Sequence, residues 1–204
     1  MRHGIVCALA VALLCACQPS AGATPRQAHP ERRDGASSGL PARLLPRASQ
    51  PMTLRELSKI VGATCENADT GDRCFGGDYD VELRPDCSGH GLLAGVIATD
   101  GALLIDKAPP DDSVRRAMLS QGQLVCIQAI ARAGASPSYY YVVAVRRSDL
   151  PKCLASSECG QFDGRNVKWL ISHGNKACTE SASGRFDGDC AAGWIRESKV
   201  SILK

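Results

Sequence analysis

The 204-residue sequence is poor in the residues and motifs from which most enzyme sites are built. It has only 4 histidines, and aromatic residues make up 4% of the chain. It contains no P-loop, no dinucleotide-binding glycine motif, no His-Glu-x-x-His motif and no Gly-x-Ser-x-Gly nucleophile turn. These absences argue against nucleotide-dependent, zinc-hydrolase and serine-hydrolase activities. We therefore predict no enzyme, no catalytic residue, no metal and no cofactor.

A strong excess of charge and a long apolar run are also missing. The net charge of +3 at pH 7 is too small to indicate binding to nucleic acid. The apolar run Ile5–Ala16 has 12 residues, whereas a transmembrane helix needs about 20. A run of this length after a basic N-terminus is typical of a secretory signal peptide.

The apolar run ends in Leu14-Cys15-Ala16-Cys17, and the polar Gln18 follows. This segment resembles the lipobox of bacterial lipoproteins, although Cys15 stands where Ala, Ser or Thr is commoner. The resemblance implies that residues 1–16 are removed and that Cys17 carries the lipid. It also implies a cell-envelope location, at the outer membrane facing the periplasm. An ordinary secretory signal cut near residues 21–23 is the alternative.

Residues 17–51 hold six prolines, many Ala, Ser, Gly and Arg residues, and no aromatic residue. Such a composition buries too little apolar surface to order itself, so we predict a flexible, lipid-anchored tether. We assign residues 52–152 to a β domain with an N-terminal helix. Residues 153–204 are predicted to be a cysteine-rich β extension of the same domain.

Cysteine is abundant, with 11 residues. Removing those of the signal peptide and the lipidation site leaves an even number for the folded part. In an oxidising envelope this predicts disulfides, and no C-x-x-C pair supports a zinc site. Many pairings are possible. Pairing of near neighbours predicts Cys65–Cys74, Cys87–Cys126, Cys153–Cys159 and Cys178–Cys190.

Short strands dominate the folded part. Thr53 and Glu56 have capping-box spacing, which predicts a helix that ends at Gly62. The Asp100-Gly101 dipeptide predicts a hairpin. Alternating or continuous apolar segments predict strands over residues 79–84, 92–98, 102–106, 123–131, 138–146, 167–172 and 194–197. We predict one or two helical turns over residues 112–120.

The order of segments over residues 92–146 resembles a bacterial SH3-like barrel. A strand, an Asp-Gly turn and a strand are followed by the divergent connection 108–121, a further strand and a tyrosine-bearing strand. An OB-like barrel is the alternative. The predicted fold class is therefore mainly β, a small SH3-like or OB-like barrel with one or two short helices, crosslinked by disulfides. In the SH3-like family, the function is usually binding, to cell-wall peptide or to another protein.

Tyr139 and Tyr141 share one face of the predicted tyrosine strand, and Tyr140 lies on the other face. We expect one of these sets in the core and the other partly exposed, with Arg146 and Arg147 beside it. Such a face would offer aromatic area with a basic rim, which suits a binding surface. A core role is the alternative for each tyrosine.

The remaining polar motifs have structural explanations that are at least as good as functional ones. Two Phe-Asp-Gly repeats, at 162–164 and 186–188, predict related hairpins whose phenylalanines pack on disulfides. A calcium loop is the alternative, but it lacks EF-hand spacing. Its ligands would be Asp163, Asp187 and Asp189. His90 and His173 lie in turn-like contexts. Paired carboxylates for sugar hydrolysis are available at Asp111-Asp112 and at Asp78, Asp80 and Glu82, where a solvated surface is the simpler explanation.

Together these features predict a lipid-anchored envelope binding protein that performs no chemistry. Its predicted partners are the membrane, through the lipid, and another envelope protein or peptidoglycan, with no nucleic acid. The alternative is a periplasmic inhibitor or immunity lipoprotein that blocks a toxin or hydrolase.

Overall fold

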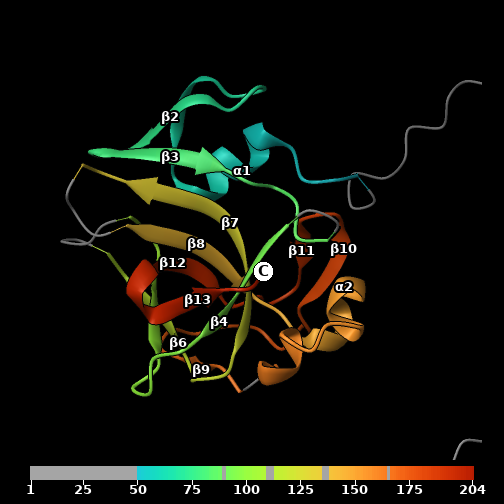
Figure 1. Cartoon of the computed structure of the whole chain (residues 1–204). Coiled ribbons are helices and arrows are strands. Elements are labelled where there is room, and N and C mark those ends of the chain that lie inside the picture. The colour runs from blue at the N-terminus through green and yellow to red at the C-terminus, as the bar shows by residue number, and fades with distance from the viewer. Residues whose placement is uncertain (1–49, 89–90, 109–112, 135–137, 165) are drawn as a thin grey trace, which may run out of the picture. The chain divides into compact units, whose positions relative to one another are not determined.

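A computed structural model describes residues 50–88, 91–108, 113–134, 138–164 and 166–204 (Figure 1). The predicted signal peptide, Cys17 and nearly all of the predicted tether lie outside these residues, as do His90 and Asp111-Asp112. The helices are α1 (Leu54–Val61), α2 (Pro151–Leu154) and the 3₁₀ helices η2 (Arg147–Asp149), η3 (Cys159–Gln161) and η4 (Glu197–Lys199). The strands are β1 (Thr64–Asn67), β2 (Asp72–Gly76), β3 (Tyr79–Leu83), β4 (Leu92–Val96), β5 (Ala102–Ile105), β6 (Arg115–Leu119), β7 (Leu124–Arg132), β8 (Tyr139–Ala144), β9 (Lys168–Trp169), β10 (Thr179–Ala182), β11 (Arg185–Asp187), β12 (Ala192–Arg196) and β13 (Val200–Ile202).

Helix α1 begins and ends where the sequence predicts. The Thr53 side chain accepts a hydrogen bond from the Glu56 amide, and the Glu56 carboxylate accepts one from the Thr53 amide. This capping box satisfies two amides that have no partner within the helix. The chain leaves the helix through Gly62, whose φ of 73° is left-handed. The helix buries Leu57 and Val61 against the sheet.

Strand β7 is the centre of the main sheet, and its residues 124–131 are all buried. Strand β8 pairs along one edge of β7. The other edge is divided, because β4 pairs with residues 124–127 and β3 pairs with residues 129–132. Figure 1 shows β7 and β8 side by side across the middle of the molecule. Burial of both faces explains why β7 reads as a continuous apolar run rather than an alternating one.

The strands form an open, branched sheet rather than a closed barrel. Its main path runs β1-β2-β3-β7-β8-β12-β5-β6-β9, and β4 and β13 extend from β7. Among the described residues this path does not return to its first strand. The prediction of a mainly β fold with short helices and disulfides is confirmed. The predicted closure into an SH3-like or OB-like barrel is not found.

The C-terminal segment is part of this sheet. Strand β12 lies between β8 and β5, and β13 pairs with β4. Strands β5, β6 and β9 are connected to the rest of the sheet only through β12, within the part of the chain that the structure describes. Residues 153–204 therefore complete the architecture of residues 52–152.

The Asp100-Gly101 turn forms, but it does not produce the predicted hairpin. The Gly101 amide donates to the Ala98 carbonyl, and Gly101 has a φ of 79°. The strands on either side then diverge, because β13 occupies the edge of β4 that β5 would take. Strand β5 pairs with β6 and β12 instead.

The prediction of helical turns over residues 112–120 is wrong for the described part of that segment, which forms strand β6. Ala117 and Leu119 are buried, while Arg116 and Met118 are only half-buried, so the inner part of the segment has the two-residue period of a strand. Pairing with β5 on one side and β9 on the other satisfies its backbone.

The two Phe-Asp-Gly repeats do not form related hairpins. The second repeat lies in the β10–β11 hairpin, but Phe162 of the first follows the 3₁₀ helix η3. Both Phe162 and Phe186 pack against the buried cluster that contains Cys87, Cys126, Cys153 and Cys159, as expected for phenylalanines beside disulfides.

Alternation along β8 gives the sheet two buried faces. Tyr140 and Val142 point into one cluster, with Leu104 and Leu119. Tyr139 and Tyr141 point into the other, beneath α1. Among the described residues no helix is long and apolar enough to cross a membrane.

Candidate functional site

All eight cysteines of the described chain are in disulfides, and the pairing is the predicted one. The bonds are Cys65–Cys74, Cys87–Cys126, Cys153–Cys159 and Cys178–Cys190. The described residues therefore offer no thiol as a nucleophile or metal ligand. They also contain no group of three or more His, Cys, Asp or Glu side chains that could hold a metal ion.

The tyrosine strand does not form a binding face. Tyr139, Tyr140 and Tyr141 are 4%, 4% and 5% exposed. The prediction that one set would be partly exposed is wrong, because clusters of side chains cover both faces of β8. The tyrosines act in packing instead: the Tyr141 ring lies edge-on to Trp194, with ring centroids 5.5 Å apart.

Tyr140 has a further polar contact in the core. Its hydroxyl donates to the Glu197 carboxylate over 2.8 Å. Burial and this neighbouring carboxylate both disfavour the phenolate, and they raise the pKa of Tyr140 to about 12.

The two arginines of the predicted face have separate roles. Arg147 donates hydrogen bonds to the carbonyl oxygens of Cys153 and Leu154, which fixes helix α2 on the end of β8. Arg146 is exposed and pairs with Asp149 over 3.3 Å. Arg146 also lines a large cleft, so one residue of the predicted face belongs to a concave surface.

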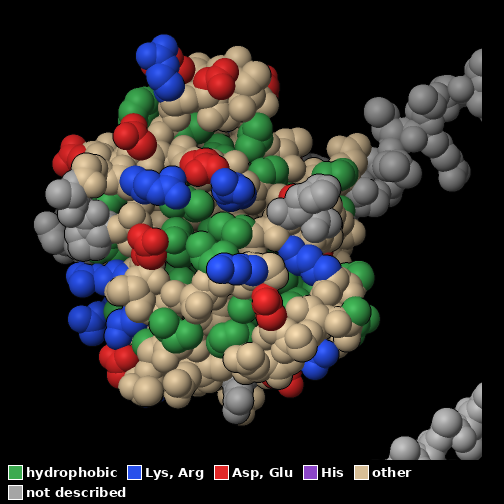
Figure 2. Space-filling view, viewed as in Figure 1, with side chains coloured by type: hydrophobic (Ala, Val, Ile, Leu, Met, Phe, Trp, Pro, Cys, Tyr) green, Lys and Arg blue, Asp and Glu red, His purple; other side chains and the backbone are tan. Residues whose placement is uncertain are grey.

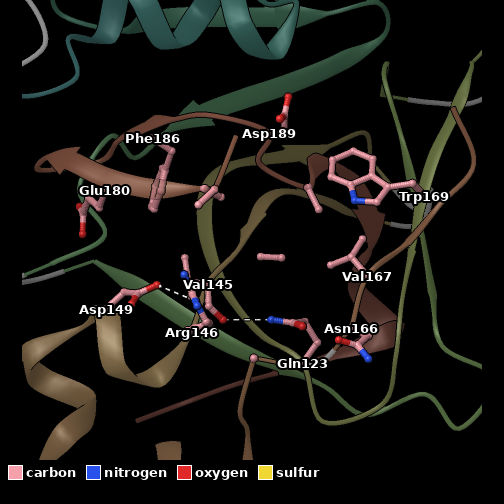
Figure 3. Close-up of a pocket in the computed structure, with 15 residues that line it drawn as sticks. Gln123, Val145, Arg146, Asp149, Asn166, Val167, Trp169, Glu180, Phe186 and Asp189 are labelled. Carbon is pink, nitrogen blue, oxygen red and sulfur yellow. Dashed lines mark hydrogen bonds and ion pairs between the residues drawn. The ribbon is translucent and has the colours of Figure 1, made fainter. Parts of the chain in front are cut away.

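We call this concavity the Arg146 cleft. It has a volume of about 540 Å³ and lies between the β7–β8 end of the sheet, β9 and the β10–β11 hairpin (Figure 3). The lining residues are Gln123, Ala144, Val145, Arg146, Asp149, Gly164, Asn166, Val167, Trp169, Ala177, Cys178, Glu180, Phe186, Asp189 and Ala191. Figure 3 shows Glu180, Phe186 and Asp149 on one side of the space and Trp169 and Asn166 on the other.

The acidic side of the Arg146 cleft is built on the β10–β11 hairpin. The Glu180 carboxylate accepts a hydrogen bond from the Gly184 amide over 2.8 Å. Burial raises the pKa of Glu180, and the negative charges of Asp86 and Asp149 add to this, while the Gly184 bond opposes it. A carboxylate in this position is stabilised by a cationic ligand, which would replace its lost hydration.

The hairpin is fixed to the rest of the domain by buried contacts. The Gln128 side-chain amide donates to the Gly184 carbonyl over 2.6 Å, and the Met52 amide donates to the Ser183 carbonyl over 3.0 Å. Arg185 forms a mostly buried ion pair with Glu56 at 2.6 Å. Glu180 is therefore held by a rigid support rather than by a free loop.

The opposite side of the Arg146 cleft carries an aromatic pair. The Trp169 and His173 rings stack with centroids 4.4 Å apart and an interplanar angle of 13°. Trp169 is half-buried and Asn166 is exposed beside it, so the cleft presents an indole and an amide together. The acids proposed as calcium ligands serve local structure: Asp163 accepts from the Gly164 amide, and Asp189 accepts from the Lys176 amide.

A second concavity lies across β6, β5, β12 and β8, and we call it the basic cleft. It has a volume of about 510 Å³. The described residues that line it are Leu103, Ile105, Ser113, Arg115, Tyr139, Trp194, Arg196 and Lys199. Of its described lining the sequence indicated Tyr139 alone, because the cations come from two distant segments, β6 and residues 196–199, that the strand pairing of β12 brings together.

Comparisons with protein-family models, with curated proteins and with solved structures found no match for this chain. The functional interpretation therefore depends on the sequence signals and on the geometry of the two clefts.

Proposed function

We propose that the protein is a lipid-anchored binding protein of the bacterial cell envelope, and that it holds peptidoglycan stem peptides in the Arg146 cleft. The observation that carries the proposal is the placement of Arg146, Asp149 and Glu180 in one concave site, with Asn166 and Trp169 opposite them.

The chemistry of a stem peptide matches these side chains. Such peptides carry a free carboxylate, the amine of a diamino acid, and several amide groups. The Arg146 guanidinium suits the carboxylate, and Glu180 suits the amine. Asn166 offers an amide partner, and the Trp169 indole offers apolar area for methyl or sugar faces.

The described residues also favour binding over catalysis. The thiols are oxidised, and His173, the one histidine among the described residues, stacks on Trp169. The Cys178–Cys190 disulfide lies in the wall of the cleft, since Cys178 is one of its lining residues, and a rigid site loses little conformational entropy when a ligand binds. Disulfides, the lipobox-like segment and the tether-like composition of residues 17–51 all suit an envelope location.

Co-sedimentation with insoluble peptidoglycan sacculi tests this proposal. The full-length protein in detergent should sediment with sacculi, and the double variant R146Q/E180Q should bind them at least about tenfold more weakly, which corresponds to about 1.4 kcal/mol. Lys168→Ala is the matched control, because Lys168 lies beside Trp169 on β9 and does not line the cleft.

The same experiment distinguishes the alternatives. Equal binding by all three proteins, or no binding at all, would contradict the role of the Arg146 cleft. Release of soluble muropeptides by the wild type would contradict a binding function without chemistry. If R146Q/E180Q unfolds within a few degrees of the wild type, any loss of binding to sacculi is caused by the change in the cleft and not by unfolding of the domain.

A further inference from the structure

We propose that the basic cleft is a second binding site, and that it takes an acidic segment of a partner protein. This inference does not depend on the proposed binding of peptidoglycan, because the two clefts have no lining residue in common among the described residues. It depends on the strand register, the burial and the charge of the residues described below.

Strand register places the floor of the basic cleft on one face of the sheet. Arg115 of β6 is paired with Ile105 of β5, and Ile105 is paired with Trp194 of β12. Two residues further along β12, Arg196 is paired with Tyr139 of β8. Since side chains two residues apart share a face, Trp194 and Arg196 both point to the cleft side.

The centre of the basic cleft is apolar, and its central side chain, Trp194, is fixed in position. Trp194 is 1% exposed, and its indole N–H donates to the Val61 carbonyl over 3.2 Å. Leu103 and Ile105 are half-buried and supply the accessible apolar surface. The Trp194 ring is thus held in place by its hydrogen bond to the last residue of helix α1.

The charge of the basic cleft has one sign. Its described lining includes Arg115, Arg196 and Lys199 and no carboxylate. Lys199 is bound to Asp100, with both carboxylate oxygens 2.9 Å from the ammonium nitrogen. The side chains of Arg115 and Arg196 have no hydrogen-bond or ion-pair partner among the described residues.

The described acids that are near in sequence are already engaged, and Asp111-Asp112 lie outside the described residues. Besides Asp100, Glu197 follows Arg196 directly and accepts the Tyr140 hydroxyl. Asp106, at the end of β5, accepts the Val114 amide over 2.7 Å. Figure 2 shows several Lys and Arg side chains at the left edge of the molecule, with Asp and Glu side chains above and below them. The guanidinium groups of Arg115 and Arg196 are therefore available to an anionic ligand.

The shape of the cleft favours an acidic peptide segment over a lipid surface. A membrane contacts groups that protrude, whereas Leu103, Ile105 and Trp194 lie at the bottom of a concavity. An extended segment with alternating acidic and apolar residues matches both parts of the cleft. Its carboxylates would pair with Arg115 and Arg196, and its apolar side chains would contact Leu103 and Ile105.

Binding of a fluorescent Glu-Leu-Glu-Leu-Glu-Leu peptide to the full-length protein in detergent tests the inference. Anisotropy should show saturable binding, with a dissociation constant that rises at least about tenfold in R115E/R196E. The control K168E/K176E makes the same change in net charge at two exposed positions that do not line either cleft.

Every outcome decides the inference. Loss of peptide affinity in R115E/R196E alone supports the inference. Equal loss of affinity in R115E/R196E and K168E/K176E overturns it, because the binding is then unspecific charge attraction. Failure of the wild type to bind the peptide also overturns it. If R115E/R196E is unfolded by circular dichroism, the milder pair R115Q/R196Q must show the same loss.

Two further probes exclude other anions. Vesicles of phosphatidylglycerol and phosphatidylcholine, and inorganic phosphate, are measured with the same variants. Arginine-dependent binding to vesicles, or phosphate competition at millimolar concentration, would replace the acidic peptide with a lipid surface or a small anion. Wild-type sedimentation with sacculi is measured separately, so failure here and failure of the Arg146 cleft remain distinguishable.

Discussion

Gly95 shows how a single residue couples the C-terminal segment to the sheet. A Cβ atom at position 95 would lie 2.0 Å from the Phe162 ring, which therefore packs directly on the β4 backbone. We expect Gly95→Ala to destabilise the domain by about 1–3 kcal/mol, because the ring has to leave its place in the cluster around Cys153 and Cys159. Urea unfolding measures this change.

Gly160→Ala is the control for Gly95→Ala. At position 160 the nearest atom to a new Cβ is Arg147 Nη1, at 3.5 Å, which is ordinary contact. We expect a change within about 0.5 kcal/mol. Similar losses in both variants would show that the Phe162 contact has no special role.

Tyr140 makes the free energy of unfolding depend on pH in the alkaline range. Its pKa is raised from 10.0 to about 12, so the folded state favours the neutral phenol. This contribution to stability is present below pH 10 and is lost as the pH rises through about 12. We expect Tyr140→Phe to flatten the decline of the unfolding free energy over that range, as measured by urea unfolding at several pH values.

Tyr79→Phe provides the comparison for Tyr140→Phe. The Tyr79 ring lies edge-on to Tyr139, and in the described structure its hydroxyl has no carboxylate partner. If Tyr79→Phe flattened the alkaline decline as strongly as Tyr140→Phe, the Glu197 contact would not be its cause.

The tyrosine strand also marks a limit of prediction from the sequence at the scale of residues. Alternation correctly places Tyr140 on one face and Tyr139 and Tyr141 on the other. Whether either face meets solvent depends on what packs on it, and both sets of contacts come from elsewhere in the sequence: α1 on one face, and β5 and β6 on the other. Arg146 was included in the predicted face only because it lies at the end of the tyrosine strand, and the structure shows it exposed.

Among the structural elements, the disulfides differ in how much chain they close. Cys87–Cys126 spans 39 residues, and Cys153–Cys159 spans 6. The loss of loop-closure entropy predicts about 4 kcal/mol of stabilisation for the longer loop and about 2 kcal/mol for the shorter. We therefore expect C87A/C126A to be less stable than C153A/C159A. All four sulfurs are buried, so cavity effects are comparable.

Chemical denaturation under non-reducing conditions measures this difference. Peptide mapping of each variant has to confirm that the three remaining disulfides are unchanged. An equal loss of stability in the two variants would show that local packing, and not loop closure, determines how much each disulfide stabilises the domain.

At the scale of elements, the signals that act within a few residues were predictive and the long-range ones were not. The capping box, Gly62, three of the four disulfides and the β7–β8 hairpin all depend on short separations, whereas Cys87–Cys126, which was also predicted, spans 39 residues. The Asp100-Gly101 turn was also local, but whether its flanking strands pair with each other depended on β13, which takes the free edge of β4. The basic cleft could not be predicted for the same reason, since its register depends on β12.

For the whole molecule, the proposed lipid anchor at Cys17 would decide where both proposed binding sites lie. The Leu14–Cys17 segment resembles a lipobox, and two or more acyl chains are needed for stable anchoring. We expect Cys17 to be diacylated or triacylated in a bacterial host. Metabolic labelling with palmitate should therefore mark the wild type and leave Cys17→Ala unlabelled. Equal label in both proteins would contradict the anchor.

The position of β12 and β13 has a consequence for the time course of folding. Both strands come from residues 192–202, yet β12 is the element that attaches β5, β6 and β9 to β8. A chain that emerges from an export channel with its N-terminus first delivers this element last. Pairing between distant segments is slow, so the sheet cannot be completed before β12 and β13 have emerged, even when the short-range disulfides have already formed. Removal of residues 192–204, which keeps Cys190 and all four disulfide pairs, would leave a chain that oxidises normally and never reaches its native topology.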